Sequence, residues 1–335
     1  MTLKVGVNGF GRIGRSVIRL LVEREGVELV AINSTREIDL ICHLLKYDSL
    51  YRTWDKKIEP GEESIYVDGK EIKILGEREP EKLDWDLLGV DVVVEATGQF
   101  KERDKAALHL GESVKKVIIT APGKKEDLMV VMGVNEDEYQ PDKHHVISNA
   151  SCTTNCVAPL AKVLHDEFGI NEAMMTTIHA YTNDQVLLDS SHKDKRRARA
   201  ASMSIIPTTT GAAQAVSKVV PSLEGKIDGI SFRVPTPTVS TVDLVATLEK
   251  NVSVKEVNEA FKKRAETTMR GILDYNDELL VSVDYTGDPH SAVVDGESTM
   301  KVGENMIKVV AWYDNEWGYS VRVVDLVEYL AEQGI

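Results

Sequence analysis

Cysteine and long apolar stretches are scarce in this sequence of 335 residues, and basic residues are fewer than acidic ones. Three cysteines, Cys42, Cys152 and Cys156, are too few for the disulfide framework of a small secreted domain and fit a reducing cytoplasm. No apolar stretch approaches the roughly 20 residues of a membrane helix, and the opening MTLKVGVNGF lacks the basic and apolar segments of a signal peptide. Forty basic against 54 acidic residues give a net charge of −14, which argues against broad nucleic-acid binding. We therefore expect a cytoplasmic protein with neither a membrane nor a nucleic-acid partner.

The first part of the chain has the pattern of a parallel sheet with crossover helices. An apolar strand over 2–10 leads into glycines, the next segment has apolar residues at helical spacing, and a second strand covers 27–33. Strand, helix and strand within about 30 residues form a βαβ unit. Further buried strands are expected over 91–98 and 115–123, and the DGK turn within 58–75 indicates an antiparallel hairpin.

The pattern changes near the middle of the chain, whose length already exceeds what one core usually covers. A helix is expected to begin just after Cys152, and segments of alternating apolar and polar residues follow at 229–235, 241–249 and 306–314. Such alternation predicts an antiparallel sheet with one open face. We therefore predict a nucleotide-binding domain over 1–150 and an α+β domain after it.

The motif NGFGRIG places Gly9, Gly11 and Gly14 in the spacing G-x-G-x-x-G. In a dinucleotide-binding loop the first glycine permits a tight turn, the second lets the backbone approach a pyrophosphate, and the third lets helix pack close to strand. The helix that follows directs free N–H groups at the phosphates. Alone the motif is weak, because glycines also occur in ordinary turns. Here it follows a strand and opens a helix, so its required context is met and we predict dinucleotide binding.

Cys152 and His179 are the candidates for chemistry. Cys152 lies at the expected start of a helix, where the helix N-terminus stabilises a thiolate and a nearby imidazolium would lower the pKa of the thiol further. A free cysteine is more often a small buried hydrophobe, and Cys156, one turn further on, fits that role better. His179 ends a strand-like run at a polar loop, a place where catalytic groups occur. The remaining histidines are interpreted as solvated or packed: His43, His109, His144, His145, His165, His192 and His290.

Taken together, the motifs resemble phosphorylating glyceraldehyde-3-phosphate dehydrogenase of the bacterial and eukaryotic type. The resemblance runs nearly end to end. It rests on NGFGRIGR (8–15), LLKYDS (44–49), VISNASCTTNC (146–156), HAYTNDQ (179–185), RRARAAS (196–202), IIPTTTGAA (205–213), RVPTP (233–237) and WYDNEWGYS (312–320).

The resemblance implies a fold and a mechanism. The fold would be a Rossmann-type doubly wound parallel sheet domain over 1–150, completed by a C-terminal helix within 315–335, plus an α+β catalytic domain over 151–314 with a mainly antiparallel sheet. Cys152 would attack an aldehyde, and His179 would help to keep the thiolate and then take the hydroxyl proton as hydride leaves for a nicotinamide. Inorganic phosphate would cleave the resulting thioester to an acyl phosphate. A thioester conserves the free energy that this last step requires.

The resemblance also assigns binding residues. The attacking phosphate maps to Ser151, Thr153, Thr210 and Gly211, and the substrate's own phosphate to Thr182, Arg197 and Arg233. Within the basic cluster 192–199, Lys193 and Lys195 are interpreted as solvated or as subunit contacts. The cofactor maps to the glycine loop with Arg12 and Ile13, and further to Arg78, Thr97, Thr120, Ser191 and Asn315. The family forms a homotetramer in which a loop near 181–203 reaches the neighbouring cofactor, and no metal is implied.

Two alternatives remain open from the sequence. The same family includes an enzyme that acts on erythrose 4-phosphate with the same cysteine and histidine. The second alternative is a protein that keeps the fold and the cofactor but has no catalytic activity, although the intact Cys152 and His179 argue against it.

The identity of the cofactor depends on the segment VAINSTREID. The carboxylate that binds the adenosine ribose is expected about 20 residues after the glycine loop, where Ser34 stands. A serine removes the repulsion of a 2′-phosphate, and Thr35 and Arg36 could donate to one. Glu37 or Asp39 could instead replace the missing acid, or Arg36 could point to water. Ser190 and Ser191 stand where NAD-specific members commonly carry a bulky Leu-Pro or Gly-Pro pair, which makes this chain similar to members that accept NADP. We therefore predict NADP as the preferred cofactor, with NAD also accepted.

Overall fold

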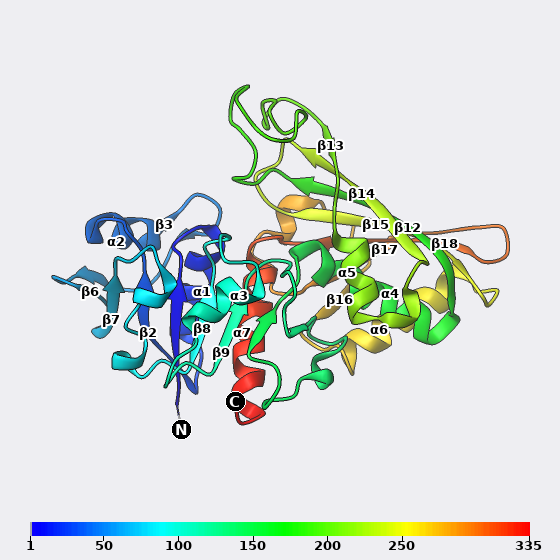
Figure 1. The fold of residues 1–335 in the computed structure, drawn as a ribbon. Helices are drawn as coiled ribbons and strands as arrows, with labels where there is room; N and C mark the ends of the chain where they lie inside the picture. Colours follow the sequence, from blue (N-terminus) through cyan, green and yellow to red (C-terminus); the bar gives the residue numbers. More distant parts are fainter. Residues whose placement is uncertain (1) are drawn as a thin grey trace. The chain divides into compact units, whose positions relative to one another are not determined.

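The structure, a computed structural model, describes residues 2–335 and contains two compact units. The first unit comprises residues 2–130, Asp137–Ala150 and Ser320–Ile335, and the second comprises Val131–Glu136 and Ser151–Tyr319. Figure 1 shows the first unit mainly in blue and cyan and the second mainly in green to orange. Each unit is built around its own sheet.

The first unit contains a nine-stranded sheet. In chain order its strands are β1 (Leu3–Asn8), β2 (Val27–Asn33), β5 (Ile58–Pro60), β6 (Ser64–Val67), β7 (Lys70–Leu75), β8 (Val92–Glu95), β9 (Lys116–Ile119), β10 (Leu128–Met129) and β11 (Val146–Ser148). Their spatial order is β10-β11-β9-β8-β1-β2-β7-β6-β5. The strands from β10 to β7 are parallel and rich in buried valine and isoleucine, as expected for a sheet covered on both faces. The order of the strands reverses between β1 and β8, where α/β folds of this kind bind ligands.

The predicted hairpin is present and extends this sheet. Strands β6 and β7 pair antiparallel across a turn at Asp68 and Gly69, both with positive φ, which suits a tight two-residue turn. Strand β7 also pairs parallel with β2, so the hairpin forms one edge of the nine-stranded sheet. A small ladder joins β3 (Tyr47–Asp48) and β4 (Arg52–Thr53).

The helices of the first unit are α1 (Arg12–Glu23), α2 (Ile38–Lys46), α3 (Arg103–Ala106) and most of α7 (Trp317–Glu332). Helix α1 packs on β1 and β2, directly after the glycine loop. On α7 the apolar residues Val323, Leu326, Val327 and Leu330 are fully buried. This chain end therefore contributes to the core of the first unit.

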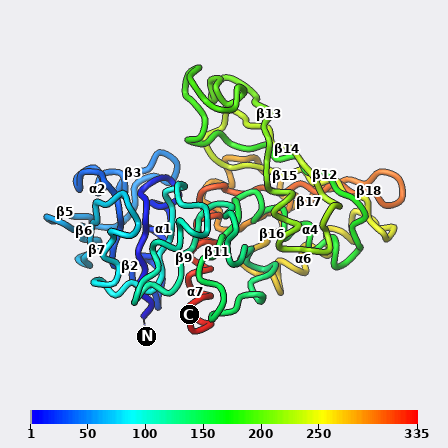
Figure 2. The backbone as a smooth tube through the Cα atoms, viewed as in Figure 1, coloured from blue at the N-terminus to red at the C-terminus, as the bar shows by residue number. Residues whose placement is uncertain are grey.

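The second unit contains a seven-stranded sheet. Its strands are β12 (Ile170–Ala180), β13 (Ile206–Thr208), β14 (Ile227–Val234), β15 (Ser240–Leu248), β16 (Leu273–Asn276), β17 (Ala292–Val302) and β18 (Met306–Tyr313), in the spatial order β13-β14-β12-β15-β18-β17-β16. Helices α4 (Cys152–Phe168), α5 (Ala212–Val219) and α6 (Val254–Glu266) pack on it. Figure 2 shows the segment between β12 and β13 as an irregular loop beyond the end of the sheet.

Most strand pairs of the second sheet are antiparallel, and alternate residues of β15 are buried. The pairs β12–β14 and β16–β17 are parallel, because long crossovers through helices or loops join them. Met174, Met300 and Met306 are exposed on the strands. A parallel sheet in one unit and a mainly antiparallel sheet in the other confirm the predicted fold class. Within residues 2–335, no helix has both the length and the apolar character needed to cross a membrane.

Asp127 fixes the entry into β11, the strand that leads to Cys152. Its carboxylate accepts the N–H groups of His145 and Val146, both at 2.8 Å, and the Nε–H of Arg103 at 3.0 Å. Burial raises the pKa of Asp127, but these hydrogen bonds and the charge of Arg103 outweigh it and hold the pKa below its ordinary value. The stabilisation is therefore present above the pKa of an unfolded aspartate, about 3.9, and is lost as the pH falls through the folded-state pKa.

We expect Asp127→Asn to lower the free energy of unfolding by about 1–3 kcal/mol at pH 7, because one largely buried carboxylate, 15% exposed, serves three donors. The difference from the unsubstituted protein should shrink progressively as the pH falls below the pKa of an unfolded aspartate, about 3.9. Urea unfolding at pH 7 and along a series of acidic pH values measures it. Asp104→Asn is the matched control, since the Asp104 side chain is 91% exposed and 3.7 Å from the same arginine. Equal effects of the two substitutions would contradict the assignment.

Candidate active site

The N-terminus of α4 presents Cys152. Ser151 is the N-cap, and its hydroxyl oxygen accepts the N–H of Thr154 at 3.0 Å. The preceding residue, Ala150, has a positive φ of 54°, uncommon for a residue with a Cβ and frequent at functional sites. The 17-residue helix directs its positive end at the first turn, where Cys152 stands. Cys152 is partly exposed as a residue, whereas Cys156 is fully buried.

His179 lies next to Cys152. It is the penultimate residue of β12, is 3% exposed, and places Nε2 3.5 Å from the Sγ atom of Cys152. The ring of Tyr313 packs edge-on against the imidazole, with centroids 6.1 Å apart. The Tyr313 hydroxyl lies 3.0 Å from the hydroxyls of both Thr153 and Thr177. The structure thus brings together the two residues predicted for chemistry.

The other nitrogen of His179 has two neighbours of opposite character. Nδ1 is 2.7 Å from the carbonyl oxygen of Ala180 and 2.8 Å from Nη1 of Arg233. A carbonyl only accepts and a guanidinium only donates, so the two contacts favour opposite tautomers of the imidazole. With the proton on Nδ1 and donated to Ala180, Nε2 is free to accept a proton from Cys152.

The protonation of the pair differs from the sequence-based expectation. Burial lowers the pKa of His179 to about 3, and the charges of Arg233 and Arg197 act in the same direction. Burial raises the pKa of Cys152, although the charge of Arg233 and the hydrogen bonds from Thr153 oppose it. The prediction of a low-pKa thiol beside an imidazolium is therefore wrong. The sequence shows which charges are near but not how strongly both groups are desolvated.

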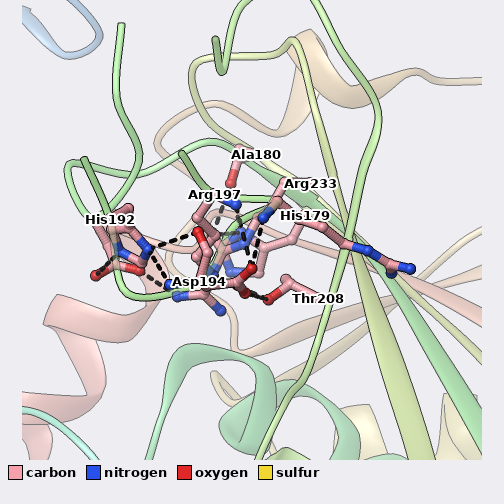
Figure 3. Close-up of polar contacts among 9 residues, drawn as sticks. His179, Ala180, His192, Asp194, Arg197, Thr208 and Arg233 are labelled. Carbon is pink, nitrogen blue, oxygen red and sulfur yellow. Dashed lines mark hydrogen bonds and ion pairs between the residues drawn. The ribbon is translucent and has the colours of Figure 1, made fainter. Parts of the chain in front are cut away.

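Two arginines, Arg197 and Arg233, stand near His179 (Figure 3). Arg233, on β14, donates from Nη1 to Ala180 at 3.0 Å. Arg197, in the loop before β13, donates from Nε to Thr208 at 3.0 Å and forms an ion pair with Asp184. Both guanidinium groups lie on the second unit close to His179, as a site for a phosphate requires.

The other predicted anion-binding residues lie on the same unit. Thr210 precedes α5, accepts the N–H of Ala212 at 3.2 Å and lines a cavity of about 520 Å³ together with Thr208 and Asp194. Gly211 is the N-cap of α5, so free N–H groups and a positive helix end are available there. Thr182 follows β12 and is half-buried, while Ser191 is exposed in the loop.

The glycine loop borders a cavity of about 330 Å³ in the first unit. A Cβ atom at Gly14 would lie 2.2 Å from the carbonyl oxygen of Gly9, so helix and strand approach closely there. Gly9 itself has a φ of 113°. Gly11, the N-cap of α1, has no atom within 4 Å of such a Cβ and is open to a ligand. The cavity is lined by Asn8, Gly9, Phe10, Gly11, Asn33, Ser34, Thr35, Arg36, Glu77, Arg78, Ala96, Thr97, Gln99 and Phe100.

Several predicted cofactor residues line this cavity and others do not. Its lining includes Gly9, Gly11, Ser34, Thr35, Arg36, Arg78 and Thr97, whereas Arg12, Ile13, Gly14, Thr120, Ser191 and Asn315 are not part of it. Arg12 forms an ion pair with Asp48, and Thr120 donates to the carbonyl oxygen of Glu95 at 3.1 Å. Asn315 accepts the hydroxyl of Ser240 at 2.9 Å.

The wall near Ser34 has a distinctive charge pattern. Ser34 is buried, and its hydroxyl oxygen accepts the N–H of Arg36 at 3.4 Å. Arg36 and Arg78 line the cavity, and Glu77 is the carboxylate among its described lining residues. Glu37 and Asp39, considered above as replacements for the missing acid, do not line it.

Sequence reasoning missed the residues that support the site. Ser240 receives the N–H of Ala180 at 3.1 Å and donates to Asn315, so it connects β12 to the residue predicted to orient a nicotinamide. Asp184 and Tyr313 were also missed, although both lie inside the quoted motifs. Within residues 2–335, no group of three or more His, Cys, Asp or Glu side chains could hold a metal ion.

Comparison with known proteins places both units in one family. The family model described as glyceraldehyde 3-phosphate dehydrogenase, NAD binding domain, matches residues 3–103, and the one described as the C-terminal domain matches residues 151–315. Glyceraldehyde-3-phosphate dehydrogenase of Geobacillus stearothermophilus is 57% identical over 335 residues and covers 100% of both chains. Glyceraldehyde-3-phosphate dehydrogenase 2 of Bacillus subtilis strain 168 is 55% identical over 99% of this chain and 97% of its own. The resemblance predicted from the motifs is confirmed, and this chain belongs to the glyceraldehyde-3-phosphate dehydrogenase family.

Proposed function

We propose that this protein catalyses the phosphorylating oxidation of D-glyceraldehyde 3-phosphate to 1,3-bisphosphoglycerate, and the reverse reaction, with a nicotinamide cofactor. The observation that carries the proposal is the 3.5 Å contact between Sγ of Cys152 and Nε2 of His179 at the N-terminus of α4. A nucleophile within reach of a base, with cationic groups beside them, is the arrangement required for covalent catalysis on an anionic aldehyde. The family membership supports the same reaction.

Cys152 and His179 divide the chemistry between them. As the Sγ atom of Cys152 attacks the aldehyde carbon, its proton passes to Nε2 of His179, and Nδ1–H of the imidazolium donates to Ala180. Nε2–H of the resulting imidazolium protonates the alkoxide oxygen, which gives a thiohemiacetal on Cys152 and a neutral His179. Nε2 then removes the hydroxyl proton, and a bound nicotinamide would accept the hydride, which leaves a thioester on Cys152. Attack of inorganic phosphate on the thioester carbon releases the acyl phosphate, and the imidazolium returns its proton to the departing thiolate.

Binding of the substrate changes the charge balance around the base. Arg233 and Arg197 are the charges that lower the pKa of His179, and they are also the residues proposed to hold the substrate's phosphate. A dianionic phosphate on these guanidinium groups offsets their charge and makes His179 a stronger base. The base is therefore weak without substrate and stronger with it. Thr210, Gly211, Ser151 and Thr153 are proposed to hold the inorganic phosphate, at the N-termini of α5 and α4.

NADP is the proposed preferred cofactor, with NAD also accepted. Two arginines, Arg36 and Arg78, line the cavity near Ser34, where a 2′-phosphate would lie after a G-x-G-x-x-G loop. Arginine suits a phosphate by charge and by paired hydrogen bonds. A serine at position 34 offers a hydroxyl donor and no repulsion.

The protein is proposed to act in the cytoplasm as a homotetramer. All three cysteines are free, which fits a reducing compartment. The loop before β13 exposes Leu187, Leu188, Met203 and Ile205, each at least 67% accessible. Exposed apolar side chains concentrated on one loop favour a contact with another copy of the chain.

Replacing Cys152 with serine should reduce dehydrogenase turnover below detection, because a hydroxyl is a far weaker nucleophile at neutral pH. Formation of reduced cofactor, followed at 340 nm with glyceraldehyde 3-phosphate and inorganic phosphate, measures it. Erythrose 4-phosphate serves as the comparison substrate. Cys156→Ser is the control, since this thiol is buried one turn further along α4 and should leave most activity intact. Retained activity in Cys152→Ser would refute its role, and no activity of the unsubstituted protein with either aldehyde would refute the enzyme.

Replacing Ser34 with aspartate should shift the cofactor preference toward NAD by about tenfold to a hundredfold, because a buried carboxylate repels the 2′-phosphate. The ratio of kcat/KM for NADP to that for NAD measures the shift. Ser34→Asn is the matched control, because asparagine has nearly the size of aspartate but no charge. A hundredfold preference of the unsubstituted protein for NAD would overturn the proposed cofactor.

The solution mass should be four times that of the chain, which light scattering coupled to size-exclusion chromatography measures. Leu188→Glu should lower the mass. Leu188 is 69% exposed in the single chain, and the proposed contact between copies would bury it, where a charged side chain is unfavourable. Leu87→Glu is the control, since Leu87 is 83% exposed on the first unit. A monomeric unsubstituted protein would contradict the proposed assembly.

A further inference from the structure

Polar residues end three neighbouring strands beneath the cofactor cavity. Glu95, Asn8 and Asn33 are the last residues of β8, β1 and β2, and they are Cα partners in register across these parallel strands. All three are at least 94% buried. Asn8 and Asn33 also line the cavity beside the glycine loop. None of the three has a role in the chemistry described above.

The carboxylate of Glu95 receives only donors. Oε2 accepts Nδ2–H of Asn8 at 2.5 Å and lies 3.2 Å from Nε2 of His109. Oε1 accepts the N–H of Thr97 at 2.8 Å and also the Thr97 hydroxyl. Among the described residues, no lysine or arginine is paired with this carboxylate. Hydrogen bonds alone therefore compensate its burial, and each of them matters.

Trp85 determines which nitrogen of His109 carries the proton. Nε1–H of Trp85 donates to Nδ1 of His109 at 3.1 Å, and an indole can only donate. Nδ1 must therefore accept, and Nε2–H donates to Glu95. Trp85 is 2% exposed and lies on Gly6 of β1, where a Cβ atom would be 2.6 Å from its Cζ3. The glycine in this strand is what allows the indole to reach His109.

The orientation of both asparagines follows from the carboxylate. Because Nδ2 of Asn8 donates to Glu95, its Oδ1 faces the other way and accepts Nδ2–H of Asn33 at 2.7 Å. Oδ1 of Asn33 then accepts the N–H of Glu77 at 3.0 Å, and Nδ2 also donates to the carbonyl oxygen of Glu77 at 2.8 Å. The hydrogen bonds that run from Trp85 through His109, Glu95, Asn8 and Asn33 to Glu77 each have one allowed direction, and a change at any residue affects the next. Nδ2 of Asn8 also lies 3.2 Å from Nε2 of His109, where both atoms carry protons and donate to Glu95 rather than to each other.

We propose that His109, Glu95, Asn8 and Asn33 form a positioning network that holds the Glu77–Arg78 segment against the cofactor cavity and sets its affinity for the adenosine 2′-phosphate. Asn33 forms two hydrogen bonds with the backbone of Glu77. Arg78, which follows Glu77, lines the wall where the 2′-phosphate is proposed to bind. His109 also packs edge-on against Phe100, another lining residue, with ring centroids 6.2 Å apart. The inference rests on the proposed use of this cavity for a nicotinamide cofactor.

The first variants are His109→Phe and Asn33→Asp. The phenyl ring removes both the donor to Glu95 and the acceptor for Trp85, and the isosteric aspartate turns the bond to Asn8 into an oxygen–oxygen contact. Each should weaken binding of NADP about tenfold and binding of NAD less, as measured by calorimetric titration of the full-length protein. The KM for glyceraldehyde 3-phosphate should change less than twofold. His109→Gln, which keeps one donor and one acceptor, should restore binding to within about threefold.

The double variant His109→Phe/Asn33→Asp tests whether the network acts as one unit. The two residues do not touch, so independent structural effects would multiply to about a hundredfold loss, whereas a shared network predicts a loss close to that of either single change. His165→Phe is the matched control, because it removes a histidine nitrogen that accepts the N–H of Ile170 in the second unit and should leave NADP binding unchanged.

The outcomes separate this inference from the function on which it rests. Unchanged NADP binding in a folded Asn33→Asp protein, multiplicative losses in the double variant, or a fall in kcat with unchanged affinity would each overturn the network. Absence of turnover by the unsubstituted protein would instead overturn the proposed function, while the titrations would still report on the network. Should His109→Phe fail to fold, His109→Gln and Asn33→Asp carry the same comparison.

Discussion

The second unit depends on one constraint, the burial of a neutral imidazole between a thiol and a guanidinium. His179 is 3% exposed, with Cys152 on one side and Arg233 2.8 Å away on the other. Burial and positive charge both keep the imidazole neutral. An imidazole in this environment is a weak base unless an anion binds beside the arginines. In the proposed function, the two arginines account for two properties together: they attract a phosphorylated substrate, and they make the strength of the base depend on that substrate.

The surrounding structure keeps these groups at their distances. Strand β12 has neighbours on both sides: His179 pairs with Arg233 of β14, and β15 pairs with β12 up to Ile178. Side chains of β15 and β18 hold the same strand, because Ser240 accepts the N–H of Ala180 and the Tyr313 hydroxyl lies 3.0 Å from that of Thr177. On the other side of the thiol, Ser151 caps a helix long enough to have a full dipole. Catalytic groups on the ends of regular elements, rather than on mobile loops, keep a 3.5 Å contact without binding energy from substrate.

The sequence predicted most elements and singled out Cys152 and His179, which the structure places 3.5 Å apart, because those signals are local. Glycines at fixed spacing, a serine before a cysteine at a helix start, and a histidine at the end of an apolar run can all be read from neighbours in the chain. The network of Glu95, Asn8 and Asn33 could not be read in this way. Each residue ends its own strand as an ordinary polar residue, and only the register of β8, β1 and β2 places the three in one row. Desolvation was equally invisible, so the predicted pKa direction for Cys152 was wrong.

The missing acid at position 34 need not weaken the cofactor site. In the usual arrangement one carboxylate after β2 reads the ribose directly. Here the residue before it, Asn33, supports Glu77 and Arg78 from beneath, and Ser34 is left buried without charge. In the proposed function, selectivity moves from a repulsive group to a positioned cation, because an arginine held at a fixed place discriminates a phosphate from a hydroxyl by paired hydrogen bonds. A positioned cation attracts one cofactor without excluding the other, and this is the physical basis of the proposed preference for NADP with NAD also accepted.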